Sequence, residues 1–139
     1  MNDYGFHVCE NNSFWVRSSD DSIKIGGVGD FMASTQKLDN TVFDLNPDHF
    51  CILLFHHPDF LGVLHDERID LTFSGHTHGG QITFFGLFAF YVPSKYGQKY
   101  SYGLIKEGER ISFISSGVGT VFLPLRFFCR PEIVEVTLK

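Results

Sequence analysis

Two short apolar runs are the strongest pattern in the chain. Residues 50–55 are continuously apolar, and residues 69–73 form a second, mainly apolar run. Such runs are typical of strands that are buried on both faces of a sheet covered by helices. The segment between them, residues 60–67, predicts a short helix or turn. A strand, a short crossover and a second strand indicate parallel neighbours joined in the right-handed sense.

Histidines follow both apolar runs. The first run leads into His56, and the second leads into a loop, residues 75–80, with the sequence Gly-His-Thr-His-Gly-Gly. Parallel strands bring their C-terminal ends to one edge, where open α/β sheets bind their ligands. We therefore expect His56, His76 and His78 to converge, and three imidazoles in one place indicate a metal site. Two solvated loop histidines are the alternative for residues 76 and 78.

The rest of the pattern predicts further strands and one weak helix. The strands comprise an opening three-stranded meander, a hairpin and a closing strand, at residues 5–10, 13–17 and 22–28, at 100–106 and 110–115, and at 132–138. Spaced apolar residues over 31–45 fit a helix. With no linker or internal repeat, the 139 residues fit one α/β domain.

The other histidines have ordinary explanations. His57 precedes a proline and is expected at a helix entry or on the surface. His49 and His65 stand among polar residues and are expected to be solvated, and His7 is expected to have a structural partner within a strand.

Composition excludes some classes of protein. The net charge is -5, with no basic stripe, which argues against a nucleic-acid scaffold. Three cysteines without a Cys-x-x-Cys motif indicate free thiols in a reducing compartment. Residues 1–4 do not resemble a secretion signal, and the near-apolar run 82–92 is about half of a membrane span. We therefore expect a cytoplasmic protein. Its sixteen phenylalanines indicate either an aromatic core or an apolar surface that meets something else.

Several segments together resemble the calcineurin-like metallophosphoesterases. Within that family they are similar to a bacterial branch of small, often membrane-associated phosphohydrolases. The resemblance covers most of the chain and is carried by residues 25–30, 53–59, 69–82, 116–119, 124–126 and 130–133.

The resemblance implies a fold, a cofactor and a reaction. The family domain is a four-layer α/β/β/α sandwich with a pair of divalent transition metals, Mn, Fe or Zn, bridged by water or hydroxide. By resemblance, His56 and His76 ligate one metal and His78 ligates the other. The implied substrate is a phosphate ester, with lipid-linked esters and a membrane-surface location among the expectations. Gly75, Gly79 and Arg126 are the candidates for contact with the substrate.

The chain departs from the family pattern in its first half. The Asp-x-His, Gly-Asp-x-x-Asp and Gly-Asn-His blocks are missing, and Ala33 stands where the second block needs an aspartate. We therefore interpret residues 1–139 as the C-terminal portion of the domain. We expect the chain alone to be inactive or weakly active, poorly stable, and dependent on an N-terminal half or on a second copy of itself. A mononuclear three-histidine metal-binding module and a non-catalytic remnant remain as alternatives.

Overall fold

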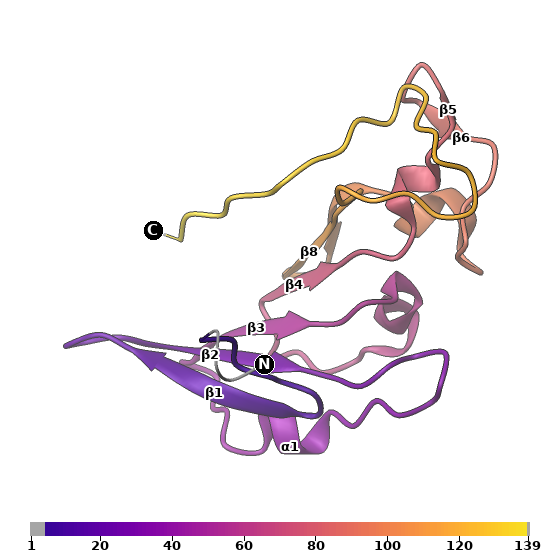
Figure 1. Ribbon diagram of the computed structural model, residues 1–139. Helices are drawn as coiled ribbons and strands as arrows, with labels where there is room; N and C mark the ends of the chain where they lie inside the picture. The colour runs from indigo at the N-terminus through magenta and orange to yellow at the C-terminus, as the bar shows by residue number, and fades with distance from the viewer. Residues whose placement is uncertain (1–4, 139) are drawn as a thin grey trace.

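The computed structural model describes residues 5–138 and shows a mixed α/β fold, as expected (Figure 1). Residues 1–4, on which the expectation about a secretion signal depends, lie outside the described part. One six-stranded sheet has the order β1-β2-β3-β4-β8-β7. Its strands are β1 (Asn12–Arg17), β2 (Ser22–Gly27), β3 (Phe50–Leu54), β4 (Leu71–Ser74), β7 (Gly103–Glu107) and β8 (Arg110–Ile114).

Short helical segments and a small hairpin complete the fold. The α-helix is α1 (Asp39–Val42), and the 3-10 helices are η2 (Pro58–Val63), η3 (His78–Gly80) and η4 (Gly97–Tyr100). Strands β5 (Thr83–Phe84) and β6 (Phe88–Ala89) pair with each other, apart from the large sheet.

The centre of the sheet is parallel, which positions the site. Strand β3 pairs in parallel with β2 on one side and with β4 on the other, and β4 pairs in parallel with β8. The prediction that the two apolar runs are parallel neighbours is therefore confirmed. The C-terminal ends of β2, β3, β4 and β8 share one edge, and the loop that follows each strand begins there.

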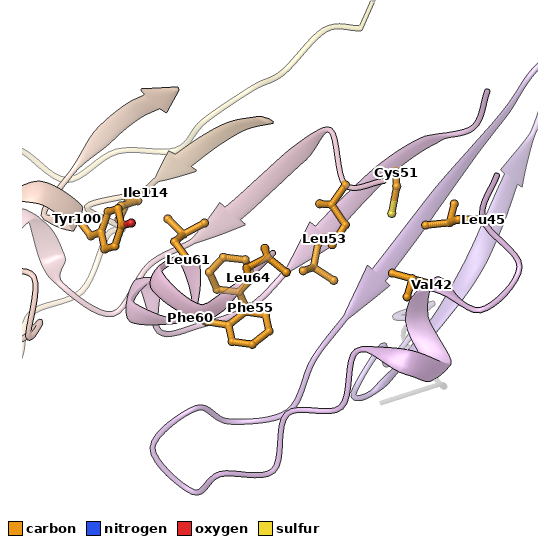
Figure 2. Close-up of a cluster of buried hydrophobic side chains, with 11 residues drawn as sticks. Val42, Leu45, Cys51, Leu53, Phe55, Phe60, Leu61, Leu64, Tyr100 and Ile114 are labelled. Atoms are coloured by element: carbon orange, nitrogen blue, oxygen red, sulfur yellow. The ribbon is translucent and has the colours of Figure 1, made fainter. Parts of the chain in front are cut away.

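The two faces of the sheet differ in how they are covered. On the covered face, Cys51 and Leu53 of β3 have no exposed surface, and they pack in one cluster with side chains from η2 and the α1 region (Figure 2). On the other face, which we call the open face, Ile52 is half-buried and Leu54 is 39% exposed. The prediction that this run is buried on both faces is wrong, because within residues 5–138 helical cover lies on one face.

The open face carries an apolar row across four strands. Register pairs align Leu54 with Phe73, Phe73 with Phe113, and Phe113 with Leu104. Aligned residues point to the same side of a sheet. A sheet with one helical layer and one apolar open face has the layers that half of an α/β/β/α sandwich contains.

Within residues 5–138, two predicted strands are absent and one predicted helix is shortened. Residues 5–10 form no strand, so the opening meander is a two-stranded pair. The helix predicted over 31–45 is reduced to α1, because Asp30 turns the chain by accepting a hydrogen bond from the Ala33 amide. Residues 132–138 form no strand, since no described strand pairs with them, and Figure 1 shows this segment running on alone.

Candidate metal centre

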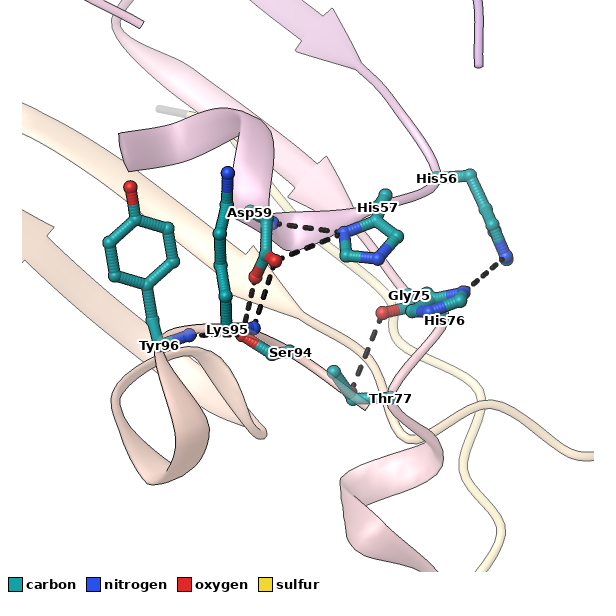
Figure 3. Close-up of polar contacts among 9 residues, drawn as sticks. All are labelled: His56, His57, Asp59, Gly75, His76, Thr77, Ser94, Lys95 and Tyr96. Atoms are coloured by element: carbon teal, nitrogen blue, oxygen red, sulfur yellow. Dashed lines mark hydrogen bonds and ion pairs between the residues drawn. The ribbon is translucent and has the colours of Figure 1, made fainter. Parts of the chain in front are cut away.

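His56 and His76 meet at the parallel edge, as the sequence predicts. His56 follows β3 and His76 follows β4, and the Gly75 amide donates to the His56 carbonyl at 3.0 Å. The Nε2 atom of His56 lies 3.3 Å from the Nδ1 atom of His76, with the rings edge to face (Figure 3). Two strand ends thus place two imidazole nitrogens opposite each other.

This pair of nitrogens fits a divalent metal. Two imidazole nitrogens bound to one tetrahedral zinc are about 3.3–3.4 Å apart, given Zn–N distances of about 2.0–2.1 Å. The 3.3 Å separation between His56 and His76 matches that requirement. Within residues 5–138, no three His, Cys, Asp or Glu side chains are grouped closely enough to hold an ion by themselves.

The histidine loop has an unusual backbone. His76 has φ +69° and His78 has φ +52°, a left-handed conformation that side chains other than glycine rarely adopt. Such strain persists only where the surroundings enforce it, and it gathers at functional sites. Here the Thr77 hydroxyl donates to the Ser101 carbonyl at 2.6 Å and anchors the loop between the two histidines.

The predicted loop glycines differ in what the fold demands of them. Gly79 has φ +62°, and a Cβ atom there would lie 2.6 Å from the Cys129 sulfur, so both the backbone and the space require glycine. At Gly75, a Cβ atom would meet only the Ser115 carbonyl, at 3.9 Å. Contact of either glycine with a substrate remains a prediction.

His57 belongs to the site, although its sequence context did not indicate a contact with the other histidines. The helix-entry alternative is confirmed, because the His57 Nδ1 accepts from the Asp59 amide at 3.3 Å and caps η2. The surface alternative is wrong: the side chain is buried, and its ring lies 4.0 Å from the His76 ring. The available signal was the His-Pro-Asp sequence, in which Pro58 suits the first turn of a helix.

Burial favours the neutral form of both stacked histidines. Burial lowers the pKa of His57 below 6.5, although Asp59 opposes the shift. Burial also lowers the pKa of His76 below 6.5, and the neighbouring His57 and His56 add to the effect. A neutral imidazole is the form that ligates metals.

Asp59 connects this pair to a distant loop. Its carboxylate accepts hydrogen bonds from the Ser94 hydroxyl and, at 3.0 Å, from the Lys95 amide (Figure 3). The Asp59 side chain is buried, so these bonds hold η2 and the loop in fixed relation. The contacts that hold the His76 ring in place therefore extend through His57 and Asp59 of η2 to residues 94–95.

The expected convergence of all three imidazoles is wrong for His78, which lines the same cavity but faces a different partner. Its Nδ1 atom lies 3.2 Å from the Gly119 carbonyl oxygen in the loop after β8. The cavity has a volume of about 670 Å³, and His56, His76 and His78 all line it. Much of the remaining wall is apolar and comes from Ile82, Phe90, Tyr91, Pro93, Val121, Phe122 and Leu123.

Arg126 uses its guanidinium on backbone carbonyls. Its Nη2 atom lies 2.6 Å from the carbonyl oxygens of both Ser116 and Gly119. Its Nη1 atom lies 3.4 Å from the carbonyl oxygen of His78. Arg126 thus ties the loop after β8 to the histidine loop, and a role in binding a substrate anion remains a prediction.

The other three histidines lie outside this site. His65 is exposed, as expected. His49 is half-buried against the edge of the Trp15 ring, so the prediction that it is solvated is wrong. His7 is exposed and stacks on Phe14, although it is not in a strand.

Comparison with known proteins identifies the family. The chain is 37% identical, over 97% of its length, to the uncharacterized metallophosphoesterase YkuE of Bacillus subtilis, of which it covers 47%. It is 34% identical, over 81% of its length, to the UDP-2,3-diacylglucosamine pyrophosphatase LpxG of Chlamydia trachomatis, of which it covers 36%. It is 38% identical, over 63% of its length, to the phosphodiesterase YaeI of Escherichia coli, of which it covers 32%. No family model and no solved structure matches it.

These similarities confirm the resemblance to metallophosphoesterases that the sequence motifs indicated. The chain belongs to the metallophosphoesterases, the family after which YkuE is named. It spans about half the length of YkuE and about a third of LpxG and YaeI. Across residues 5–138, no helix has both the length and the apolar content needed to cross a bilayer.

Proposed function

We propose that this chain carries the histidine ligands of a metallophosphoesterase that hydrolyses a phosphate monoester or diester with metal-activated water. His56 and His76 serve one metal and His78 serves the second, with two divalent metals, Mn, Fe or Zn, in the complete site. The carboxylate and remaining nitrogen ligands come from an N-terminal half of the domain or from a partner chain, so the isolated chain has little or no activity.

One observation carries this proposal. His56 Nε2 and His76 Nδ1 lie 3.3 Å apart at the edge where two parallel strands end. Divalent metals at such a site would polarise the phosphoryl oxygens and make water nucleophilic near neutral pH. The chain's own residues shape the site. The His57 ring stacks against the His76 ring, and the cavity beside them can receive an ester.

Metal binding by the chain itself tests the proposal. We expect titration calorimetry with Zn²⁺ or Mn²⁺ to show binding that His76→Ala weakens at least about 10-fold, because a ligand is lost. His65→Ala is the matched control, since His65 is an exposed histidine outside the site. Unchanged affinity in His76→Ala, with the variant folded by circular dichroism, would contradict the proposed role.

Phosphoesterase activity is the second arm of the test. Mixing the chain with the separately expressed N-terminal half of YkuE should produce turnover of bis-p-nitrophenyl phosphate in the presence of Mn²⁺. The same mixture made with His56→Ala should lose that turnover. Turnover that persists in this variant would remove His56 from the proposed ligand set.

A second candidate function is a metal-binding module without catalysis. It is favoured by the position of His78, whose Nδ1 faces the Gly119 carbonyl rather than the other two rings. One metal per chain, together with no turnover in any mixture, would support this module over the two-metal hydrolase. No bound metal at all would leave a non-catalytic remnant.

The cavity wall favours an ester with an apolar group, such as a lipid-linked phosphate at a membrane surface. Phe122 is 96% exposed and Tyr91 is 70% exposed, and both line the histidine cavity. Apolar side chains this exposed mark surfaces that bind apolar partners. We expect dodecyl phosphate to bind the metal-loaded chain at least about 10-fold more tightly than methyl phosphate, and Phe122→Ser to reduce that preference. Equal affinities would argue against a lipid-linked substrate.

A further inference from the structure

The Gly119 carbonyl oxygen is contacted by two side chains, and these contacts define the tautomer of His78. Arg126 donates to this oxygen through Nη2 at 2.6 Å and through Nε at 3.0 Å. The Nδ1 atom of His78 approaches the same oxygen at 3.2 Å. The same guanidinium also donates to the carbonyls of Ser116 and Gly117, so several donors hold the loop after β8 in place.

A carbonyl oxygen can only accept, so the hydrogen bond from His78 requires a proton on Nδ1. In a neutral imidazole the other nitrogen, Nε2, then keeps its lone pair. Arg126 Nη2 also lies 3.5 Å from His78 Nδ1, and a hydrogen bond donated by the guanidinium would need Nδ1 without a proton, but this is the longer of the two contacts. The shorter contact to the Gly119 oxygen therefore decides the tautomer.

We propose that Arg126 is a positioning residue that acts through the Gly119 carbonyl, holding His78 in the Nδ1-protonated tautomer and leaving Nε2 as its ligating atom. This inference rests on the proposed role of His78 as a metal ligand. Histidine ligands commonly donate their second ring nitrogen to a carbonyl or carboxylate, which fixes the ring and raises its basicity. Here the oxygen that accepts this hydrogen bond is the Gly119 carbonyl, which an arginine holds in place.

The two histidines of the loop then use opposite nitrogens. His76 presents Nδ1 toward His56, whereas His78 uses Nδ1 for the Gly119 carbonyl and presents Nε2. The left-handed backbone at both residues and the anchored Thr77 between them fix the two rings in these separate orientations. Arg126 is thereby assigned to positioning, because its donors are directed at backbone carbonyls.

The direct test reads the tautomer in the unsubstituted chain without metal. Long-range ¹H–¹⁵N spectra of the histidine-labelled protein above pH 7 distinguish a protonated Nδ1 from a protonated Nε2. The signal of His78 is identified by its loss in His78→Asn. We expect His78 to be protonated on Nδ1, and protonation on Nε2 would overturn the inference whether or not the chain binds metal.

A set of variants then tests the part played by Arg126. Arg126→Gln should give a mixture of His78 tautomers and weaken binding of Zn²⁺ about 10- to 100-fold, as the loss of such supporting contacts does elsewhere. Arg126→Lys keeps the charge but loses the planar fork, so it should not restore the parent tautomer. Arg130→Gln is the matched control, because it removes the same charge at an exposed position.

The outcomes separate this inference from the proposed function. If Arg126→Gln lowers the melting temperature but leaves the His78 tautomer and the Zn²⁺ affinity unchanged, Arg126 is merely structural and the inference is wrong. If the tautomer is as expected but His78→Ala binds metal as tightly as the parent chain, His78 is not a ligand, and the proposed function fails at that residue.

Discussion

The two faces of the central sheet show how differently neighbouring residues of one strand can be used. Leu53 points into the covered face and has no exposed surface, whereas Leu54, the next residue, lies on the open face and is 39% exposed. Both are leucines in the same apolar run, and side chains alternate between the faces of a strand. A continuous apolar run therefore indicates that both faces of a strand need to be buried. Which face is buried depends on other segments of the chain that pack against it.

The largest expected effect contrasts these two leucines directly. Leu53→Ala should reduce the free energy of unfolding by about 2–5 kcal/mol, because it leaves a cavity in the cluster with η2. Leu54→Ala should cost about 1 kcal/mol or less, since its surface is already partly in water. Urea denaturation measures both, and similar losses would mean that the open face is packed as well as the covered face.

Self-association should depend on the open face. A row of apolar side chains across four strands, over which the described part of the chain places no helical layer, favours association of the chain with itself or with another protein. Sedimentation velocity should show oligomers that Leu54→Lys shifts toward the monomer. Val63→Lys is the control, because Val63 is 47% exposed but belongs to η2, on the covered side. A monomeric parent chain with a sharp, cooperative melt would contradict this expectation.

Thiol reactivity should distinguish the faces without a change in sequence. Burial, with a smaller contribution from Asp70, raises the pKa of Cys51 on the covered face to about 11. Cys129 is part-exposed. At pH 8, iodoacetamide should modify Cys51 at least about 100-fold more slowly than Cys129, because the thiolate is the nucleophile. Leu54→Cys should add a fast-reacting thiol, and a fast-reacting Cys51 would show that the covered face opens readily.

The smallest expected effect concerns the attachment of the helical layer near α1. Arg68 donates to the Val42 carbonyl at 3.1 Å, and its hydrogen bonds to Asp66 hold the pKa of that carboxyl below 3.8. Because the folded pKa lies below the unfolded one, this stabilisation is present above about pH 3.8 and is lost as the pH falls through the folded value. Asp66→Asn should therefore cost less than about 1 kcal/mol at pH 7 and less still in acid, since Arg68 is partly exposed.

Urea denaturation of the parent and Asp66→Asn at pH 7 and at pH 3 measures this difference. Asp48→Asn is the control, because Asp48 is an exposed carboxylate. If the difference between parent and Asp66→Asn were the same at both pH values, the Arg68 contact would not be the source of the stabilisation.

Local patterns were sufficient for the parts of the fold that depend on nearest neighbours. The sequence could predict strands β3 and β4 and the hairpin of β7 and β8. Their apolar runs and their turn depend on residues that are adjacent in the chain. The predicted strand at 132–138 failed for the opposite reason. Its alternating pattern requires a partner strand, and none of the described strands pairs with it.

The candidate site divides in the same way. His56 and His76 could be placed together from sequence, because parallel strands fix where their ends meet. The stacking of His57 on His76 and the contact between His78 and Gly119 could not be predicted. They depend on which side of a loop each ring takes, and that is set by packing between segments distant in the chain.

The sequence by itself determined the order of the central elements, the histidines at the two strand ends and the relationship to metallophosphoesterases. Strand ends and sequence motifs depend on residues that are neighbours in the chain, so they can be recognised without knowledge of the tertiary contacts. Only the tertiary structure decided which sheet face is covered, that His57 stacks on His76, and that His78 faces the Gly119 carbonyl. Each of these requires residues far apart in the chain to meet, and the free energy of such a contact is defined only once the whole fold has brought them together.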